Sequence, residues 1–171
     1  MAIRDAKDLF VYGLSGAHNL EKSILTDLSS MTQECDTQEC RNLFEREQQE
    51  AQRQIRNLEQ CFQILGRQPI SVTDHVVRAL HEDRNAFVQQ NPSPEMVELY
   101  NLDAASKVEH IQVATYRSLV DRAQQLGEQD CARLLQENLR SEEEETREVE
   151  QVLHQVGARI IGRQRPMGTG A

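Results

Sequence analysis

Apolar residues recur every three or four positions along most of the chain, the spacing that places them on one face of an α-helix. Segments with this spacing alternate with short polar or glycine- and proline-containing stretches. Helices are predicted at about residues 3–31, 38–65, 74–90 and 94–126, and from about 128 to between 157 and 162. Alternating runs of β-branched residues, which predict strands, are absent from the sequence. The pattern therefore predicts an all-α protein.

Residues that begin and end helices support these boundaries. Asp36 or Thr37 can cap the helix that starts near residue 38, and Gly66 can terminate it. Pro94 suits the first turn of the next long helix, and Gly127 follows its end. The expected helices thus have plausible local start and stop signals.

The second and third long helices are separated by about 28 residues, which include the short helix over residues 74–90. An up-down-up-down bundle uses short loops throughout, whereas a ferritin-like bundle joins two helical hairpins by a long crossover. A ferritin-like four-helix bundle with a short extra helix in the crossover is therefore predicted. We expect one domain over residues 1–160 and a flexible basic, glycine-rich tail over residues 161–171.

Polar residues interrupt the apolar face of every long helix. Stepping alternately three and four residues along these faces passes through apolar positions and several acids and amides near the middle of each helix. These polar positions are Glu21, Glu47, Glu50, Gln54, Glu109, Gln112 and Glu142. Each lies at a similar distance from the turn that its helix adjoins, so the chain geometry allows the four helices to bring them together.

A carboxylate on a buried helix face has to protonate, pair with a cationic group or bind a metal ion, because an isolated buried charge is several kcal/mol unfavourable. A single such residue can also bend toward solvent. Lysine and arginine are scarce on these faces. Two divalent cations that share bridging carboxylates would neutralise four acids together. The pattern thus favours a di-metal site.

Four segments resemble successive parts of the YciE/YciF-like ferritin-like family. They are DAKDLFVYGLSGAHNLEKSIL, FEREQQEAQRQIRNLEQCFQILG, ASKVEHIQVATYRSL and ARLLQENLRSEEEETREVE. The resemblance spans residues 4–156 in order, and its most specific pieces are LEKSIL, KVEH and LLQENL.

This resemblance implies a stress-associated bundle protein with a carboxylate-rich di-metal site for iron or manganese, and a homodimer. It assigns the metal site to the inward acids and amides of the four helices, which are Glu21, Glu50, Gln54, Glu109, Gln112 and Glu142. The chain departs from the family pattern at Gln112 and Thr146, where acids are common, and at Glu47, where histidine is frequent. Neutral ligands bind hard cations more weakly. We therefore expect reduced metal affinity, with one metal position occupied or none.

Composition and charge limit the kinds of partner and the cellular location that we expect. The net charge is −9 and the pI is about 5.1, so the broad basic face that nucleic acids require is not expected. The sequence contains neither a signal-peptide pattern nor an apolar run long enough for a membrane span, so we expect a cytoplasmic protein. Cys35 and Cys40 could form a disulfide, but reduced thiols are favoured in that compartment.

Histidine and tyrosine residues near the acids leave alternatives open. His18 could hydrogen-bond a metal ligand or bind a displaced ion, although a solvated helix pair is the more common case. His110 is expected at the surface, because adjacent helix residues diverge by about 100°. Tyr116 could hydrogen-bond a ligand carboxylate or simply fill the core.

Three functions fit these observations. The first is a di-metal protein that reacts with dioxygen or peroxide, and the second is a non-enzymatic, metal-poor homodimer that has a structural or partner-binding role. Storage of iron in a ferritin-type shell is the least favoured. The sequence leaves open whether the protein is an enzyme.

Overall fold

The computed structural model describes residues 3–73 and 75–164. Within these ranges the chain forms five helices and no strand: α1 (Ala6–Glu34), α2 (Gln38–Leu65), α3 (His75–Val88), α4 (Pro94–Gln125) and α5 (Gln129–Gln164). The all-α prediction is confirmed. Helix α5 continues through Gly157 and Gly162, beyond its predicted end, and the remainder of the predicted tail lies outside the described residues.

Local sequence signals account for the helix ends. The side chain of Thr37 caps α2 by accepting a hydrogen bond from the backbone N–H of Cys40 at 3.3 Å. Gly66 ends α2 in the left-handed conformation with φ of 61°, which glycine adopts without steric cost. Gly127 adopts the same left-handed conformation in the turn between α4 and α5, with φ of 75°. Pro94 occupies the start of α4 as predicted.

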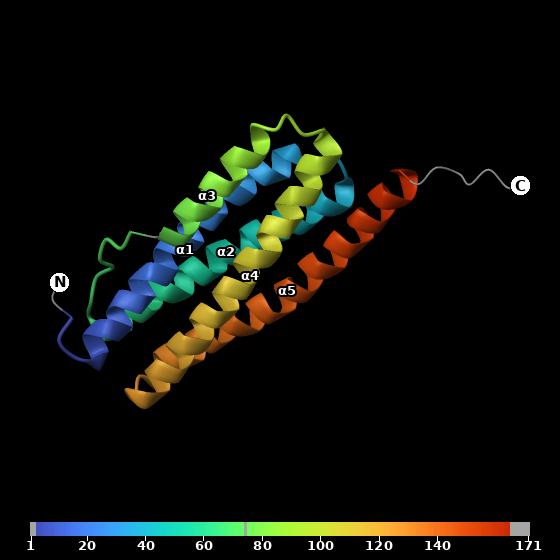
Figure 1. Ribbon diagram of the computed structural model, residues 1–171. Coiled ribbons are helices and arrows are strands. Elements are labelled where there is room, and N and C mark those ends of the chain that lie inside the picture. The colour runs from blue at the N-terminus through green and yellow to red at the C-terminus, as the bar shows by residue number, and fades with distance from the viewer. Residues whose placement is uncertain (1–2, 74, 165–171) are drawn as a thin grey trace, which may run out of the picture.

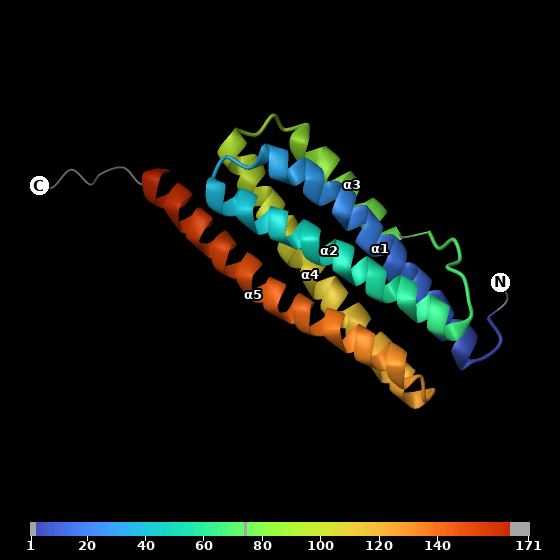
Figure 2. The ribbon, with the colours of Figure 1, turned by 180° about the vertical axis from the view of Figure 1, so that it is seen from behind.

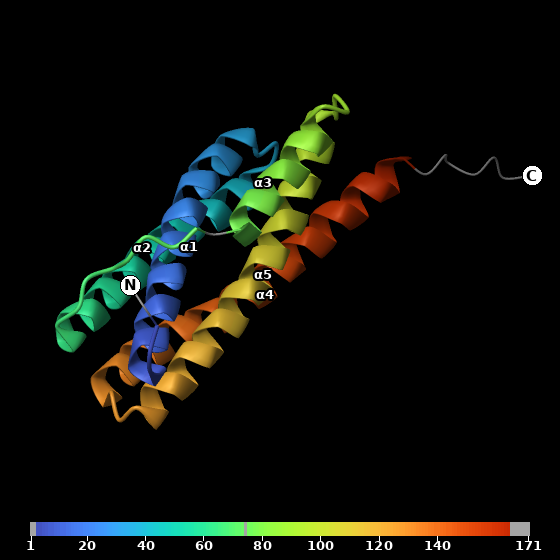
Figure 3. The same cartoon turned by 60° about the vertical axis from the view of Figure 1, so that its left-hand side comes forward.

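The four long helices form two antiparallel hairpins that pack against each other (Figure 1). Helix α1 pairs with α2, and α4 pairs with α5; α2 also packs on α5, and α1 on α4. The crossover with α3 runs back along the length of the bundle, so α4 begins at the end where α2 begins (Figures 1 and 3). This is the ferritin-like bundle with one long connection that the sequence predicts.

Helix α3 covers the outer side of α1 and α4, and the reverse view shows α2 and α5 uncovered by it (Figure 2). Its Val77 is buried, and the ring of Phe87 stacks on Tyr100 of α4 with centroids 4.1 Å apart. His81 reaches Asp27 of α1 at 2.7 Å. These contacts attach the crossover to one face and leave the opposite face, between α2 and α5, open.

The buried apolar residues form two clusters at opposite ends of the bundle. One contains Phe10 and Leu14 near the start of α1, together with residues from the ends of α2 and α4 and the start of α5. The other contains Leu28, Phe44 and Val149. Five buried polar residues lie between the residues of the two clusters: Glu47 and Gln54 of α2, Glu109 and Gln112 of α4, and Glu142 of α5. Burial of apolar side chains above and below thus stabilises a polar layer across the middle.

No helix within the described residues is both long enough and apolar enough to cross a membrane.

Candidate metal centre

The polar layer gathers side chains from all four long helices. Glu21 comes from α1, Glu47 and Gln54 from α2, Glu109 and Gln112 from α4, and Glu142 from α5, and each is at most 4% exposed. The three-four spacing of Leu and Ala on the same faces turns these side chains inward, because the neighbouring apolar residues have to face the core. Of the six predicted site residues, the structure brings five into this layer: Glu21, Gln54, Glu109, Gln112 and Glu142.

On one side of the layer, a neutral amide lies between two carboxyl groups. Nε2 of Gln112 donates hydrogen bonds to Oε1 and Oε2 of Glu21 at 3.0 and 3.1 Å, and to Oε1 of Glu142 at 3.0 Å. The Tyr116 hydroxyl donates to Oε1 of Glu21 at 2.7 Å. Nδ2 of Asn138 donates in turn to the Tyr116 oxygen at 3.1 Å. Both oxygens of Glu21 and one oxygen of Glu142 therefore accept hydrogen bonds from uncharged donors.

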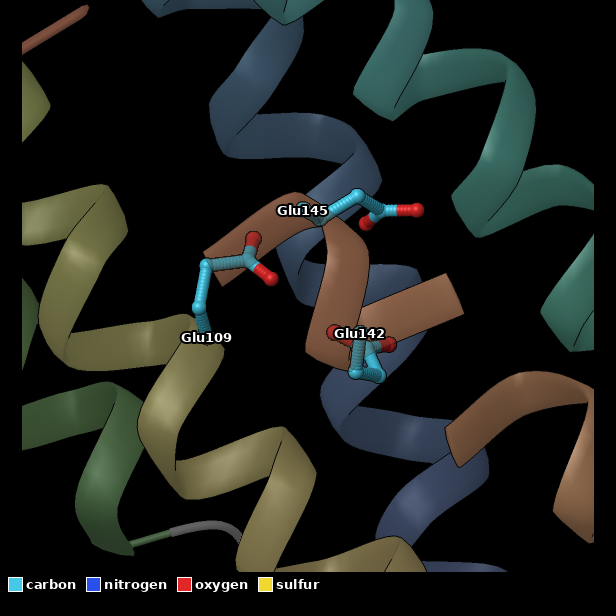
Figure 4. A group of neighbouring side chains, drawn as sticks. All are labelled: Glu109, Glu142 and Glu145. Atoms are coloured by element: carbon cyan, nitrogen blue, oxygen red, sulfur yellow. The ribbon is translucent and has the colours of Figure 1, made fainter. Parts of the chain in front are cut away.

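On the other side of the layer three acids approach one another, and the Ser141 hydroxyl donates to Oε1 of Glu145 at 2.7 Å. Glu109, Glu142 and Glu145 each offer an oxygen that lies within 4.8 Å of the other two (Figure 4). Glu109 extends from α4 toward α5, which carries the other two acids (Figure 4). Oxygen ligands bind divalent cations at about 2.0–2.6 Å, so ligands on opposite sides of an ion are about 4–5 Å apart. Three oxygens at this separation can reach one ion.

Several buried polar atoms of the layer have no hydrogen-bond partner within the described residues. Three are carboxylate oxygens, on Glu47, Glu109 and Glu142, and two belong to the side-chain amides of Gln54 and Gln112. Buried polar atoms are almost always satisfied in folded proteins, and an unpaired one is unfavourable by about 1–3 kcal/mol. Four of these atoms are oxygens that could bind a cation, whereas the fifth, Nε2 of Gln54, is a hydrogen-bond donor.

Burial and mutual repulsion raise the pKa of each acid in this group. Burial raises the pKa of Glu109 to about 8, and repulsion from Glu145 adds to the effect. Burial likewise raises the pKa of Glu145 to about 7. For Glu47 and Glu142, burial and then the neighbouring carboxylates raise the pKa well above its usual range.

Glu21 has more hydrogen bonds than these acids, but its pKa is also high. Burial raises it to about 7, although the hydrogen bonds from Tyr116 and Gln112 act in the opposite direction. Without a cation, the layer therefore holds carboxyl groups that carry protons near neutral pH. A divalent cation would replace those protons.

Glu50 does not lie in the layer, which corrects its predicted inward position. It is half-buried at the edge of the bundle, where its Oε2 lies 2.6 Å from the Arg53 guanidinium and accepts from the Ser141 hydroxyl at 2.9 Å. Although burial opposes the effect, these two partners hold the pKa of Glu50 below its usual range. The inward position after Glu47 can come three or four residues later along the helix. The structure buries the residue four positions later, Ala51, rather than Glu50.

The structure adds two acids to those that the resemblance assigns. Glu47 is 4% exposed and borders the cluster, and the half-buried Glu145 contributes an oxygen to it. Glu47 lies on the same inward track as Gln54, so its spacing was a signal for burial. Glu145 lies three residues after Glu142, a spacing at which side chains share a helix face.

The histidines do not join the site. Nε2 of His18 faces Oε1 of Glu59 at 3.5 Å, and its ring meets the edge of Phe62, with centroids 6.0 Å apart. His110 is exposed, as predicted, and its Nδ1 lies 2.8 Å from the backbone carbonyl of Ser106. Both predicted roles of Tyr116 are found: its side chain is fully buried in the core, and its hydroxyl donates a hydrogen bond to Glu21.

The four cysteines are free thiols, as predicted. Cys35 and Cys40 are both buried, and their sulfur atoms lie 2.8 Å apart beside the turn between α1 and α2.

Comparison with known proteins adds the family. Residues 5–160 match the family model described as a domain of unknown function, DUF892. The chain belongs to this family. The protein YciF of Escherichia coli K12 is 27% identical over 143 residues, which cover 83% of this chain and 86% of YciF. The resemblance to the YciE/YciF-like family is confirmed.

Three solved structures with 20–25% sequence identity share the fold of this DUF892 member. The E. coli stress protein YciF has a TM-score of 0.83 at 22% identity, covering 90% of this chain and 98% of YciF. YcfI from Rhodopseudomonas palustris, provisionally described as a structural protein, has a TM-score of 0.81 at 25% identity, covering 86% and 94%. A protein from Xanthomonas campestris pv. campestris has a TM-score of 0.74 at 20% identity, covering 94% and 99%.

Proposed function

We propose that this DUF892 protein binds one divalent cation, iron or manganese, through Glu109, Glu142 and Glu145, as part of a stress-associated function. The observation that carries the proposal is the set of unpaired oxygens on Glu47, Glu109 and Glu142, in a layer where both oxygens of Glu21 accept hydrogen bonds. Hard divalent cations prefer carboxylate oxygens, and Glu109, Glu142 and Glu145 present three of them within 4.8 Å of one another. Glu47 is positioned beside them as a further anionic group.

The hydrogen bonds of Gln112 argue for one cation rather than two. Its amide donates to both Glu21 and Glu142, so it occupies the position from which a second ion would bridge these carboxylates. An amide nitrogen satisfies the oxygens without adding positive charge. The two-ion site that the family resemblance implies is thereby reduced to a single position.

Bound iron or manganese would supply redox chemistry toward dioxygen or peroxide. The protein side chains have separate roles. Glu109, Glu142 and Glu145 hold the cation, Gln112 and Tyr116 fix the orientation of Glu21, and the apolar clusters exclude water from both ends of the layer. The E. coli relative is described as a stress protein, which agrees with a stress-associated function.

A metal-free homodimer with a structural or partner-binding role is the second candidate. It is favoured by the uncharged donors of Gln112, Tyr116 and Asn138, which stabilise protonated or singly charged carboxyl groups without an ion. The relative from R. palustris, provisionally described as structural, agrees with this alternative.

Metal analysis separates the two functions. Metal-free protein is dialysed against Mn²⁺, or against Fe²⁺ without oxygen, and bound metal is measured by mass spectrometry. We expect about one ion per chain, and at least about tenfold weaker binding in Glu142→Gln, which removes a charged ligand. Glu143→Gln is the matched control, because this neighbour points away to an ion pair with Arg117. Absence of bound metal in the unmodified protein would support the second candidate.

A further inference from the structure

A groove lies between α2 and α5. Figure 2 shows these two helices from the face that α3 does not cover. Its volume is about 580 Å³. Most of its lining is charged, with six glutamates and three arginines, so acids outnumber bases two to one. The charged residues are Glu47, Glu50, Glu137, Glu144, Glu145 and Glu148, with Arg46, Arg53 and Arg140. The excess of acids attracts cations into the groove.

The groove reaches the carboxylate layer through two shared residues. Glu47 and Glu145 line the groove, and Glu145 also belongs to the group with Glu109 and Glu142. Glu47 is 4% exposed and is repelled by Glu109 and Glu145, so it lies at the inner end of the groove. A cation in the groove therefore meets carboxylates of the cluster directly.

Two contacts span the groove and frame these residues. Arg46 of α2 pairs with Glu148 of α5 at 2.8 Å, and the Ser141 hydroxyl of α5 donates to Glu50 of α2 at 2.9 Å. Glu47 lies between Arg46 and Glu50 along its helix. Along the other helix, Glu145 lies between Ser141 and Glu148.

The groove between α4 and α5 provides a comparison. It has a volume of about 370 Å³, and its lining residues include His110, Arg117 and Glu143 but none of the acids of the carboxylate cluster. It is also spanned by an ion pair, between Arg117 and Glu143 at 2.6 Å. The two grooves share one helix and the same kind of surface pair, but only the one between α2 and α5 is lined by cluster acids.

We propose that cations reach the carboxylate layer through the groove between α2 and α5, and that the Arg46–Glu148 ion pair is a gate across this access route. The proposal rests on the proposed metal-binding function. Glu50, held at the edge by Arg53, is the outer carboxylate that first receives the ion. Glu47 and Glu145 then carry it to the position beside Glu109 and Glu142.

The gate is suited to opening. The side chains of Arg46 and Glu148 are 57% and 48% exposed, and surface ion pairs of this kind contribute little stability. Exposed side chains change rotamer within nanoseconds, so the pair can open without movement of the helices. A gate raises or lowers the barrier to passage in both directions. It therefore changes uptake and release by the same factor and leaves the equilibrium affinity unchanged.

The test measures both rates for Mn²⁺ with the full chain. Uptake is followed after rapid mixing by loss of the electron paramagnetic resonance signal of free Mn²⁺, and release by mixing loaded protein with excess chelator. Arg46→Ala and Glu148→Gln both break the gate, although they change the local charge in opposite directions. We expect each to speed uptake and release by about fivefold, with the dissociation constant within about twofold of the original.

Arg117→Ala is the matched control, since it breaks the equivalent pair of the other groove and removes the same charge from a side chain that is 63% exposed. We expect it to change either rate by less than about twofold. A second variant, Glu50→Gln, should slow uptake by about threefold through loss of the receiving charge.

Opposite effects of Arg46→Ala and Glu148→Gln would show that charge rather than gating sets the rate, and would overturn the proposed gate. Equal effects of Arg46→Ala and Arg117→Ala would also overturn it. Both results leave the metal site in place. A chain that takes up no Mn²⁺ at equilibrium would instead overturn the proposed function and the access route together.

Discussion

Tyr116 donates a hydrogen bond of 2.7 Å to Glu21 on the neighbouring helix α1, although 95 residues separate them in the sequence. Both side chains are completely buried. The pKa of the Tyr116 hydroxyl is raised well above its usual range by burial and by the carboxyl group of Glu21, so it remains a donor at all physiological pH values. The pair joins α1 to α4 at the level of the carboxylate layer.

Tyr116→Phe is expected to destabilise the protein by about 1–3 kcal/mol, because it removes a hydrogen bond from Glu21 and one of the two acceptors of the Asn138 amide. Denaturant unfolding measures this change. Tyr12→Phe is the control. Tyr12 is 41% exposed, so its substitution should change the free energy of unfolding by less than about 0.5 kcal/mol. Equal effects at the two positions would contradict the assignment of the Tyr116 hydrogen bond.

Gln112→Glu is expected to raise the metal content from about one ion per chain to about two, because it replaces the amide between Glu21 and Glu142 with a further carboxylate. Without metal, the same change should lower stability by about 1–3 kcal/mol, since it adds a like charge to a buried group. Metal analysis and thermal unfolding in a chelator test the two parts.

Gln124→Glu is the control for this change, because Gln124 lies on the exposed face of the same helix. It should alter neither metal content nor stability appreciably. A single ion in Gln112→Glu would mean that the amide is not what excludes the second cation.

The stability of the metal-free protein should fall as pH rises. Burial raises the pKa of Glu21 to about 7 and that of Glu109 to about 8, above the value of about 4.3 for an unfolded chain. Between the unfolded and folded pKa values, the folded state binds more protons than the unfolded state. The stability that these protonated groups contribute is therefore complete below about pH 4 and is lost as pH rises through 7 and 8.

Thermal unfolding in the presence of a chelator, measured from pH 5 to pH 8.5, should therefore show a steady decline in Tm. With Mn²⁺ present, the decline should shrink or reverse, since the cation binds the deprotonated carboxylates and stabilises the folded state. A Tm that is independent of pH in the chelator would contradict the raised pKa values.

Glu98→Gln should destabilise the fold by about 1–2 kcal/mol without changing metal binding. Glu98 is buried on α4 and accepts hydrogen bonds from the backbone N–H and the hydroxyl of Thr37, both at 2.7 Å, at the start of α2. Its charge lies where the helix dipole is positive. Glu95→Gln, which removes an exposed acid paired with Arg163, is the control and should have little effect in the same unfolding measurement.

The helices and their order could be predicted from the sequence because apolar spacing, caps and glycine stops agreed. The boundaries of α2 and the start of α4 match the predicted ones, and the 28-residue crossover identified the bundle type. The convergence of Glu21, Glu109, Gln112 and Glu142 followed from the same spacing, since a side chain placed among buried apolar residues shares their direction.

Side-chain partners across helices could not be predicted in this way. The choice between Glu50 and Ala51 for the interior depends on Arg53 and Ser141, which hold Glu50 at the surface. Burial of Glu98 depends on the turn between α1 and α2, more than 60 residues earlier in the chain. Spacing along one helix carries no information about either contact.

The two apolar clusters lie on opposite sides of the polar layer, and each joins all four long helices. The packing of the four helices at the two ends of the bundle therefore does not depend on which ligand or protons occupy the polar layer. Ligand residues can be exchanged, as at Gln112, and the occupant can vary from ion to protons while the scaffold persists. The residues that stabilise the fold are thus different from the residues that would bind a ligand.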